Sequence, residues 1–403
     1  MVKSSIRLAA GGFAIAMALA ACGSDKPKTS PGNSSGTTST TDGKTPATIG
    51  KAEGKVTILA WPGYAENGTT AKETDWVTPF EKETGCKAEV KTFNTSDEAF
   101  NLFHSGDYDV VSASGDSSLR SVANGDAAVI DTSLLTNYND LWEKLRGQRW
   151  NTVDGAVYGV PHGWGANLLM YNADVVKPAP TSWSAVFDKN SPYKAKITAY
   201  DSPIYIADAA LYLMKSQPDL KITDPYSLDE TQFTAAVDLL KAQKSILGEY
   251  WSEYLKEQEA FTKGSLVLGT TWQIITNLVQ GDKASPKVEA IVPSEGSTAW
   301  SDSWMVHKSS KNPNCAYMWL NWITKPDVQA QVAEYFGEAP ANLKACALTT
   351  AKDHCTTFHA DDTAYYDQLK FWTTPTTKCL DGRTDIECKS YKDWAAAWDE
   401  IKA

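Results

Sequence analysis

The chain contains none of the short motifs that mark common enzyme active sites. No G-x-S-x-G elbow, no H-E-x-x-H pair and no glycine-rich phosphate loop occurs in its 403 residues. The five histidines stand apart, and His162 has no obvious catalytic partner in the sequence. Catalysis by side chains needs a reactive group with a positioned partner, so we expect no enzymatic activity.

Positive charge is also scarce. The chain has 38 Lys and Arg against 49 Asp and Glu, which gives a formal net charge of −11. Proteins that bind nucleic acid neutralise phosphates with Lys and Arg, so we expect no nucleic-acid partner. An acidic protein suits cationic partners, although acidity is also common among soluble proteins.

Beyond the first 21 residues, no apolar run is long enough to cross a bilayer. Those residues carry Lys3 and Arg7 and then an apolar run, which predicts a signal peptide over residues 1–21. The run ends in Leu-Ala-Ala-Cys, a match to the bacterial lipobox, so Cys22 is the predicted lipidation site; the alternative is an ordinary signal peptide with an incidental cysteine. We expect a lipid-anchored protein on the extracytoplasmic face of the cell membrane, or in the periplasm.

Residues 22–54 are rich in Ser, Thr, Gly, Pro and Lys and contain no aromatic residue. Such a segment buries too little apolar surface to offset its chain entropy, so it is predicted to be a disordered tether. The remaining 55–403 is long for a single hydrophobic core and typical of two domains. The whole chain contains 15 Trp and 17 Tyr, and such rings can pack in a hydrophobic core or line a binding cleft.

Six cysteines follow the lipobox, at positions Cys86, Cys315, Cys346, Cys355, Cys379 and Cys388. An even number in an oxidising compartment predicts disulfides, and sequence alone allows fifteen connectivities. A zinc site using Cys355 with His354 or His359 is the rival interpretation. Neither a C-x-x-C pair nor an H-x-x-x-H spacing supports it, so we expect no metal site.

Strands and helices alternate at the start of the folded part. The predicted order is strand 56–60, helix 75–84, strand 87–93, a helix from Thr95 to Ser105, and strand 108–113. Thr95 and Glu98 form a capping box at the second helix. This alternation predicts a parallel sheet, whose ligands sit beyond the carboxyl ends of the strands, here residues 61–64, 94–96 and 114–116.

These elements belong to a longer succession of motifs. The succession is Trp-x-x-Tyr at 61–64, Phe-Glu-Lys-Glu-Thr-Gly at 80–85, Tyr-Asp-Val-Val at 108–111, Tyr-Gly-Val-Pro at 158–161 with Trp-Gly at 164–165, Trp-Ser-Asp at 300–302, and Val-Ala-Glu-Tyr-Phe-Gly-Glu-Ala-Pro-Ala-Asn at 332–342. Its order and spacing resemble the periplasmic spermidine/putrescine-binding proteins of ABC transporters, from about residue 55 to residue 345.

The resemblance implies the type II periplasmic-binding-protein fold, an α/β architecture of two lobes with a ligand cleft between them. We place the crossovers near Gly165 and Asp302, with a late return near Cys346. The expected division is 55–165 with 303–345 as lobe one, and 166–302 with 346–403 as lobe two.

This division also bears on the disulfides. Proximity in sequence favours the pairs Cys346–Cys355 and Cys379–Cys388. Cys86 and Cys315 remain, and the resemblance places both in lobe one, so they are the expected third pair.

A polyamine is a flexible methylene chain with two or more ammonium groups. Its capture needs carboxylates for the ammonium groups, aromatic faces for the methylenes, and neutral acceptors for the remaining N–H donors. By position in the motifs, the resemblance assigns ligand contacts to Trp61, Tyr64, Ser114, Asp201, Trp272, Trp300 and Asp302. Taken singly, a Trp after a strand is more often packing and an Asp in a turn is usually a cap, but together they match one pattern.

Three positions depart from the family pattern. Asp116 stands where the family has a tyrosine, Ile204 where it has a glutamate, and Glu338 where it has a tyrosine. One hypothesis is that Asp116 replaces the lost carboxylate from the opposite lobe; the alternative is that it caps a helix starting at Ser117. Whether Glu338 contacts the ligand stays open.

The function expected from this resemblance is that of the solute-binding lipoprotein of an ABC importer. A monomer would close its two lobes around a polyamine, without any cofactor, and then dock on a membrane permease. The alternative ligands are a sugar, which also stacks on Trp and bonds to Asp, or another cationic amine.

Overall fold

A computed structural model of the protein describes residues 46–283 and 285–403. The predicted signal peptide, the lipidation site Cys22 and most of the tether lie outside the described residues. Residues 46–54, the end of the expected tether, are described and partly packed. The Gly50 amide donates to Asn314 Oδ1 at 2.6 Å and Glu53 accepts from the Cys315 amide at 2.9 Å, so the folded part begins earlier than residue 55.

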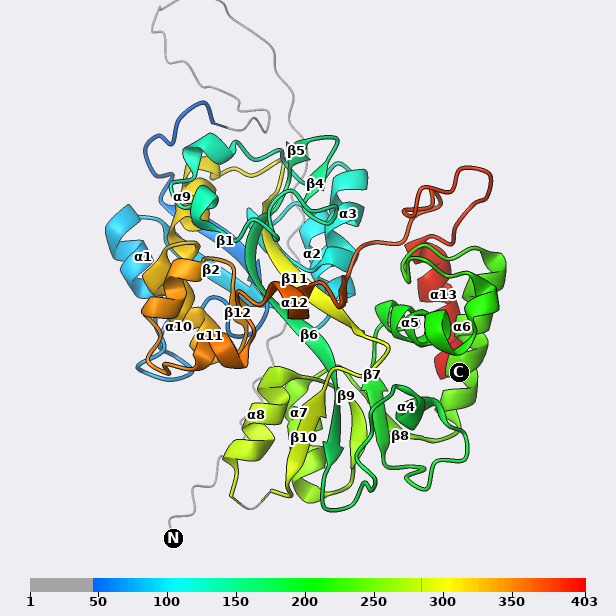
Figure 1. The fold of residues 1–403 in the computed structure, drawn as a ribbon. Coiled ribbons are helices and arrows are strands. Elements are labelled where there is room, and N and C mark those ends of the chain that lie inside the picture. The colour runs from blue at the N-terminus through cyan, green and yellow to red at the C-terminus, as the bar shows by residue number, and fades with distance from the viewer. Residues whose placement is uncertain (1–45, 284) are drawn as a thin grey trace, which may run out of the picture. The chain divides into compact units, whose positions relative to one another are not determined.

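The first part of the chain builds an alternating α/β unit (Figure 1). Its elements are β1 (Lys55–Ala60), α1 (Val77–Thr84), β2 (Lys87–Thr92), α2 (Ser96–His104), β3 (Val110–Ala113), α3 (Gly115–Ala123), η1 (Thr132–Leu134), η2 (Tyr138–Asp140), β4 (Thr152–Val153) and β5 (Ala156–Val157). The predicted strands and helices are all present within two residues of their expected limits, the helix starting at 77 instead of 75. The Thr95 side chain accepts from the Glu98 amide at 3.2 Å, which is one half of the predicted capping box. In place of the other half, Glu98 Oε2 accepts from the Asn94 amide at 2.9 Å.

The middle part forms a second α/β unit. Its elements are β6 (Val160–Asn172), α4 (Ser184–Phe187), β7 (Ile197–Tyr200), η3 (Pro203–Tyr205), α5 (Ile206–Ser216), η4 (Pro218–Leu220), α6 (Glu230–Lys244), β8 (Leu247–Trp251), α7 (Tyr254–Lys263), β9 (Leu268–Trp272), α8 (Gln273–Gly281), β10 (Val288–Ile291) and β11 (Ser297–Val306). The chain then continues through α9 (Pro313–Ile323), α10 (Pro326–Phe336), β12 (Ala339–Pro340), η5 (Leu343–Ala347), α11 (His354–Thr357), α12 (Thr363–Tyr366), β13 (Leu369–Phe371) and α13 (Tyr391–Lys402).

Two long strands in the middle of the main sheet join the two units. The strand order is β2-β1-β3-β11-β6-β9-β7-β8, with β10 and β12 paired to β6 and β13 paired to β11. The outer strands β2-β1-β3 and β8-β7-β9 are parallel, as the sequence predicts for the first three. The long strands β6 and β11 run antiparallel to each other and to β9 and β3 beside them, whereas β13 pairs with β11 in parallel. Trp300 pairs with Gly165 and Asp302 with Gly163, so the predicted crossover positions meet side by side at the centre of the sheet.

The buried side chains divide into two hydrophobic cores. One gathers around β1, β3, α1, α2, α9 and α10, and the other around β7, β8, β9, α5, α6 and α13. Ala360, Tyr366 and Phe371 belong to the first core, whereas Trp372 and Trp394 belong to the second. The lobe limits expected from the sequence stay a proposal. In the C-terminal segment, the buried side chains pass from the first core to the second between Phe371 and Trp372.

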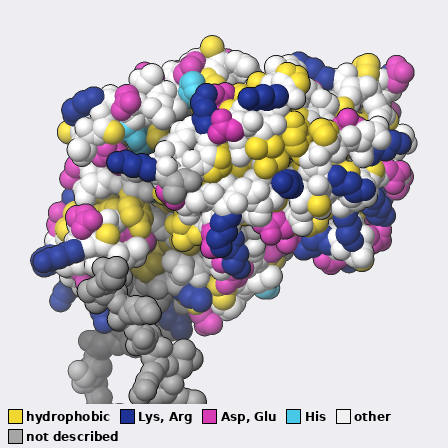
Figure 2. All heavy atoms as spheres, turned by 90° about the horizontal axis from the view of Figure 1, so that it is seen from below, with side chains coloured by type: hydrophobic (Ala, Val, Ile, Leu, Met, Phe, Trp, Pro, Cys, Tyr) yellow, Lys and Arg dark blue, Asp and Glu magenta, His cyan; other side chains and the backbone are white. Residues whose placement is uncertain are grey.

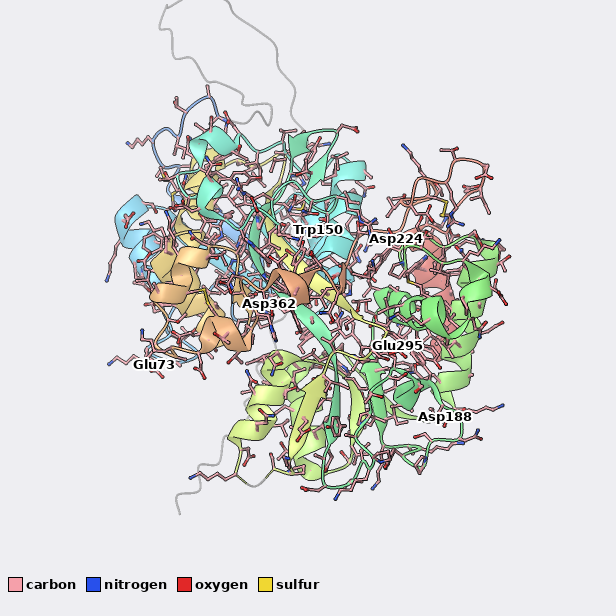
Figure 3. The ribbon with its side chains drawn as sticks, viewed as in Figure 1. Glu73, Trp150, Asp188, Asp224, Glu295 and Asp362 are labelled. Carbon is pink, nitrogen blue, oxygen red and sulfur yellow. A yellow bond between two sulfur atoms is a disulfide. The ribbon has the colours of Figure 1, made fainter. Side chains whose placement is uncertain are left out.

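Side chains outside the cores also connect the two units. Arg149, next to Trp150 of the first core, forms an ion pair with Asp224, which precedes α6 of the second unit (Figure 3). Thr374 donates to the Asp116 carbonyl at 2.8 Å, which ties the C-terminal segment to α3. The C-terminal part of the chain therefore contacts both units.

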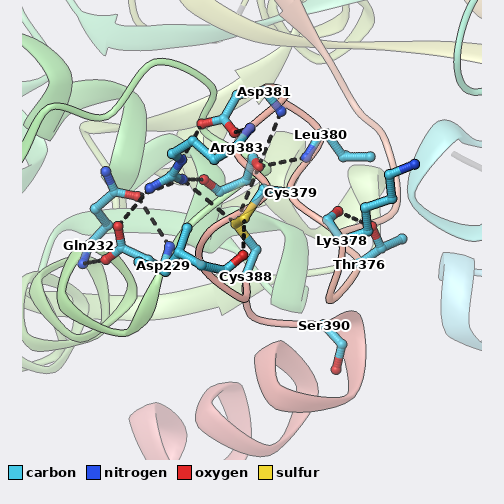
Figure 4. Close-up of a disulfide and its surroundings, with 12 residues drawn as sticks. Asp229, Gln232, Thr376, Lys378, Cys379, Leu380, Asp381, Arg383, Cys388 and Ser390 are labelled. Atoms are coloured by element: carbon cyan, nitrogen blue, oxygen red, sulfur yellow. Dashed lines mark hydrogen bonds and ion pairs between the residues drawn. A yellow bond between two sulfur atoms is a disulfide. The ribbon is translucent and has the colours of Figure 1, made fainter.

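Three disulfides are formed, in the expected pairing. Cys86–Cys315 links the end of α1 to α9 across 229 residues, while Cys346–Cys355 and Cys379–Cys388 each close a short loop. Cys355 is thus not free to bind zinc. Around the third disulfide, Arg383 binds Asp229 at 2.7 Å and the Ser227 carbonyl at 2.7 Å, so the loop is fastened to the start of α6 (Figure 4).

The surface bears charges of both signs. On the face drawn in Figure 2, basic and acidic side chains are interspersed, with hydrophobic groups between them, so the net negative charge is not gathered in one acidic patch there. Among the described residues, no helix combines the length and the apolar character that a membrane span requires.

Candidate functional site

Two carboxyl groups meet at one tyrosine hydroxyl in the centre of the fold. Tyr64 Oη lies 2.7 Å from Asp302 Oδ2 and 2.9 Å from Glu338 Oε2. All three side chains are buried, with relative exposures of 0%, 3% and 1%. We call these three residues the acid pair with its tyrosine.

Local backbone structure brings the three side chains together. Tyr64 follows β1 in a turn, in which the Tyr64 amide donates a hydrogen bond to the Trp61 carbonyl at 3.1 Å and Gly63 has φ +96°. Asp302 lies in β11, where the register with β6 shifts just after it. Glu338 follows Gly337, which ends α10 at φ +81°. A glycine adopts these positive φ values without a Cβ penalty, so the turn and the helix end both point their next side chain inward.

A chain of hydrogen bonds leads from Asp302 to Trp61, the first of three tryptophans (Trp61, Trp272 and Trp300) that we call the aromatic wall. Ser114 Oγ donates to Asp302 Oδ1 at 2.5 Å and accepts from Trp61 Nε1 at 3.3 Å. Ser114 precedes α3 at the carboxyl end of β3, and Trp61 follows β1 at the same edge of the sheet. The predicted residues Trp61, Tyr64, Ser114 and Asp302 therefore form one connected group.

The acid pair has no basic partner. No Lys or Arg of residues 46–283 and 285–403 forms an ion pair with Asp302 or Glu338. Burial raises the pKa of Asp302 to about 6, and burial together with the negative charge of Asp302 raises the pKa of Glu338 well above its ordinary value. The Tyr64 hydroxyl has a single proton to donate, so with two ionised carboxylates one short contact would lack a hydrogen. The pair needs a proton or a cation.

His162 lies on the other side of Glu338. Its Nδ1 is 3.3 Å from the Gln329 amide nitrogen, a donor, which places the imidazole proton on Nε2. That Nε2 is fully buried, makes no hydrogen bond, and lies 3.5 Å from Glu338 Oε1. Burial lowers the pKa of His162 to about 3, so it does not supply the missing positive charge at neutral pH.

A cavity of about 440 Å³ lies next to the connected group of Trp61, Tyr64, Ser114 and Asp302. Its walls are mostly apolar and come from both units: Trp61, Pro62, Gly63, Asn94, Ser252, Glu253, Tyr254, Leu255, Trp272, Ile274, Leu278, Tyr335 and Phe336. Phe336 contacts Tyr64, with ring centroids 4.6 Å apart, and also lines the cavity, so its ring stands between the cavity and the acid pair. The cavity has the size and lining of a small-molecule site.

Trp272 and Trp300 extend the aromatic wall into the second unit. Their ring centroids are 6.4 Å apart, and Trp272 Nε1 donates to Asn167 Oδ1 at 2.9 Å. Trp300 lies directly over Gly165, where a Cβ would come within 2.5 Å of its ring. The glycine at the predicted crossover therefore leaves room for an aromatic ring.

Asp201 is not brought to the acid pair. Its Oδ1 accepts from Trp398 Nε1 at 3.0 Å and pairs with Lys402 Nζ at 2.7 Å, both on α13. Ile204, three residues on, is fully buried in the second core. In this structure Asp201 anchors the C-terminal helix, and its role as a ligand contact stays a prediction.

Asp116 is buried in the first turn of α3, which begins at Gly115, so the alternative that it caps a helix starting at Ser117 is wrong. Both of its carboxyl oxygens are buried without a hydrogen bond, and the residue does not line the cavity. Burial raises its pKa to about 7. Its role at the ligand stays a prediction.

The sequence interpretation missed Phe336 and the position of His162 beside Glu338. Phe336 stands at the end of α10, one residue before a glycine, which gives it no motif of its own. His162 follows a proline in a β-strand, and the sequence around it offers no sign of its partner. Glu338 was noticed only as a departure from the family pattern.

Comparisons with known proteins agree with this architecture. A model of the family described as bacterial extracellular solute-binding protein matches residues 75–357, more than half of the chain. The spermidine/putrescine-binding periplasmic protein of Salmonella typhimurium is 26% identical over 284 residues, which cover 68% of this chain and 77% of that protein. The putrescine-binding periplasmic protein PotF of Escherichia coli is 25% identical over 311 residues, 73% of this chain and 80% of the relative.

Among solved structures, the spermidine/putrescine ABC transporter substrate-binding protein PotD of Streptococcus pneumoniae aligns with a TM-score of 0.65 at 20% identity, over 86% of this chain and 97% of that one. The Tp0655 lipoprotein of Treponema pallidum aligns with a TM-score of 0.68 at 16% identity, over 86% and 99%. These likenesses confirm the type II periplasmic-binding-protein fold that the strand order displays. The chain belongs to the bacterial extracellular solute-binding proteins.

Proposed function

We propose that this protein is the substrate-binding subunit of an ABC importer and that it captures a cationic amine of the polyamine class between its two units. The observation that carries the proposal is the acid pair of Asp302 and Glu338, which is buried beside Trp61 and forms no ion pair with a Lys or Arg of the described residues. An ammonium group supplies the missing charge and three N–H donors for the surrounding oxygens. The names of the relatives, which bind spermidine or putrescine, support the same ligand class.

The aromatic residues suit the rest of such a ligand. Trp61 and Trp272 line the cavity from opposite units, and Trp300 stands behind Trp272. Their faces cover methylene groups and add cation–π attraction of about 0.5–2 kcal/mol each. Ligand contact with both units favours the closed arrangement, because only that arrangement offers both sets of contacts at once.

A neutral sugar is the second candidate, since sugars also stack on Trp. The buried acid pair favours the amine, because the pair needs a proton or a cation, and an ammonium group can supply that charge whereas a neutral sugar cannot. Isothermal titration with putrescine, spermidine, choline and a set of simple sugars separates the two. Binding of a sugar with no response to any amine would contradict the amine proposal.

The cellular arrangement is also part of the proposal. Cleavage before Cys22 and lipidation of its thiol would hold the protein on the extracytoplasmic membrane surface, beside its permease, as a monomer without catalytic activity. A Cys22→Ala variant should lose its lipid and leave the membrane fraction. Equal membrane retention of both forms would contradict the anchor.

A further inference from the structure

We infer that the site pairs only one end of its ligand with free carboxylates, so that it takes amines with one cationic end and a neutral tail, such as N-acylated diamines or alkylamines. This inference rests on the proposed function, because it assumes that an amine enters this cavity. It narrows that function by stating how many charges the site recognises. It follows from where each buried carboxyl group lies and what already occupies it.

The cationic end belongs at Asp302 and Glu338. Their oxygens approach one point, the Tyr64 hydroxyl, from two directions at 2.7 and 2.9 Å. The fully buried His162 Nε2 lies 3.5 Å from Glu338 Oε1 and carries the imidazole proton, so it is a further donor toward this carboxyl group and cannot accept from an ammonium group. The imidazole is neutral, so the positive charge at this point has to come from the ligand.

The opposite end of the expected site has lost its free charge. Asp201 is neutralised by Lys402 at 2.7 Å and bonded by Trp398 at 3.0 Å. Ile204, at the position of the family's second carboxylate, is an apolar side chain with 0% exposure. A second ammonium group at this end would meet an occupied carboxylate and a hydrocarbon.

The other buried acids do not replace that charge. Asp208 accepts from Thr298 at 2.8 Å beside a space of about 10 Å³, which holds a single water at most. Asp116 and Glu257 are fully buried and do not line the cavity. The acid pair does not line it either, but it is connected to the cavity wall through Ser114 and Trp61 on one side and through Tyr64 and Phe336 on the other.

The cavity itself suits a neutral tail. Among the described residues that line it, the only carboxylate is Glu253, which is exposed and forms an ion pair with Lys256. The rest of the wall is largely aromatic and aliphatic, with Ile274 and Leu278 on one side and Tyr335 on another. A second ammonium group buried against this surface would lose its water without gaining a partner and would weaken binding, whereas a methyl or amide end would not.

The test compares putrescine, pentylamine and N-acetylputrescine, which carry two, one and one positive charges. Putrescine and pentylamine have the same chain length, whereas N-acetylputrescine is longer by its acetyl group. Dissociation constants are measured on the mature protein by isothermal titration. We expect N-acetylputrescine or pentylamine to bind at least as tightly as putrescine. A putrescine affinity more than about tenfold above both would overturn the inference and leave the proposed function standing, while failure of all amines to bind would overturn both.

Two isosteric variants supply the matched control. Glu338→Gln should weaken binding of all three amines by about tenfold or more, because it removes one charge from the cationic end. Asp201→Asn keeps an acceptor for Trp398 and should change each dissociation constant less than about twofold. Selective loss of putrescine binding in Asp201→Asn would overturn the inference. Melting temperatures of both variants verify folding, and the ligand comparison on the unchanged protein decides the matter independently.

Discussion

Acidification should weaken amine binding, because the ligand competes with protons for the acid pair. Burial places the pKa of Asp302 at about 6, above its ordinary value. Below this pH the carboxyl is neutral, and an ammonium group must displace its proton in order to form an ion pair. The amine itself keeps its charge over this range, because alkylammonium groups titrate near pH ~10.

The size of the effect follows from that pKa. At pH 5 a group with a pKa of about 6 is protonated in a ratio of about ten to one, so the apparent dissociation constant should be about tenfold weaker than at pH 7.5. The pKa of Glu338 is raised too, by burial and by the charge of Asp302, and its protonation acts in the same direction. The measurement is a titration of the preferred amine at pH 5, 6, 7 and 7.5.

The control is Asp302→Asn, which should bind the amine weakly and lose most of the pH dependence. Heats measured in buffers of different ionisation enthalpy should reveal proton release on binding near pH 6. A dissociation constant that stays constant from pH 5 to 7.5 in the unchanged protein would refute the reasoning. Tighter binding at pH 5 would refute it as well.

Three further predictions concern stability. Asp116→Asn should stabilise the fold by about 1–4 kcal/mol at pH 8 and little at pH 4, measured by urea unfolding. Burial raises the pKa of Asp116 to about 7, so its carboxyl group supports the folded state below its unfolded pKa and loses this contribution as the pH rises through about 7. Equal effects at both pH values would contradict this. Replacing Cys86 and Cys315 by Ala should lower the free energy of unfolding by about 5 kcal/mol, because this disulfide spans 229 residues of sequence. Removing either of the disulfides that span nine residues should lower it by about 3 kcal/mol. Guanidinium unfolding measures both, and the reverse order would contradict the prediction. Gly115→Ala should lower the melting temperature, because its Cβ would lie 1.9 Å from the Trp372 carbonyl oxygen, and an unchanged melting temperature would contradict that contact.

The sequence was most informative where local patterns decide the structure. The strands and helices between residues 55 and 113 follow from periodicity and from the cap at Thr95, and all are present. The crossovers near Gly165 and Asp302 came from the resemblance to a family, and the two strands that carry them do pair at the centre of the sheet. The three disulfides pair as proximity and that resemblance suggested.

Tertiary contacts decided what the sequence could not. Asp201 was expected at the ligand, but α13 docks beside it and brings Lys402 within 2.7 Å across 201 positions of sequence. No local sequence pattern around Asp201 predicts that Lys402 is its partner. Glu338 and Phe336 reach the site because α10 ends at Gly337, and their meeting with Tyr64 depends on how α10 packs against the first core. Such long-range placements require the assembled fold.

The most direct test of the central claim is a calorimetric titration of the mature protein with putrescine, N-acetylputrescine and a neutral sugar at pH 7.5. The account predicts saturable binding of an amine and none of the sugar, with the amine affinity reduced by about tenfold or more in Asp302→Asn. Absence of binding by every amine, or amine binding that survives unchanged in Asp302→Asn, would contradict it.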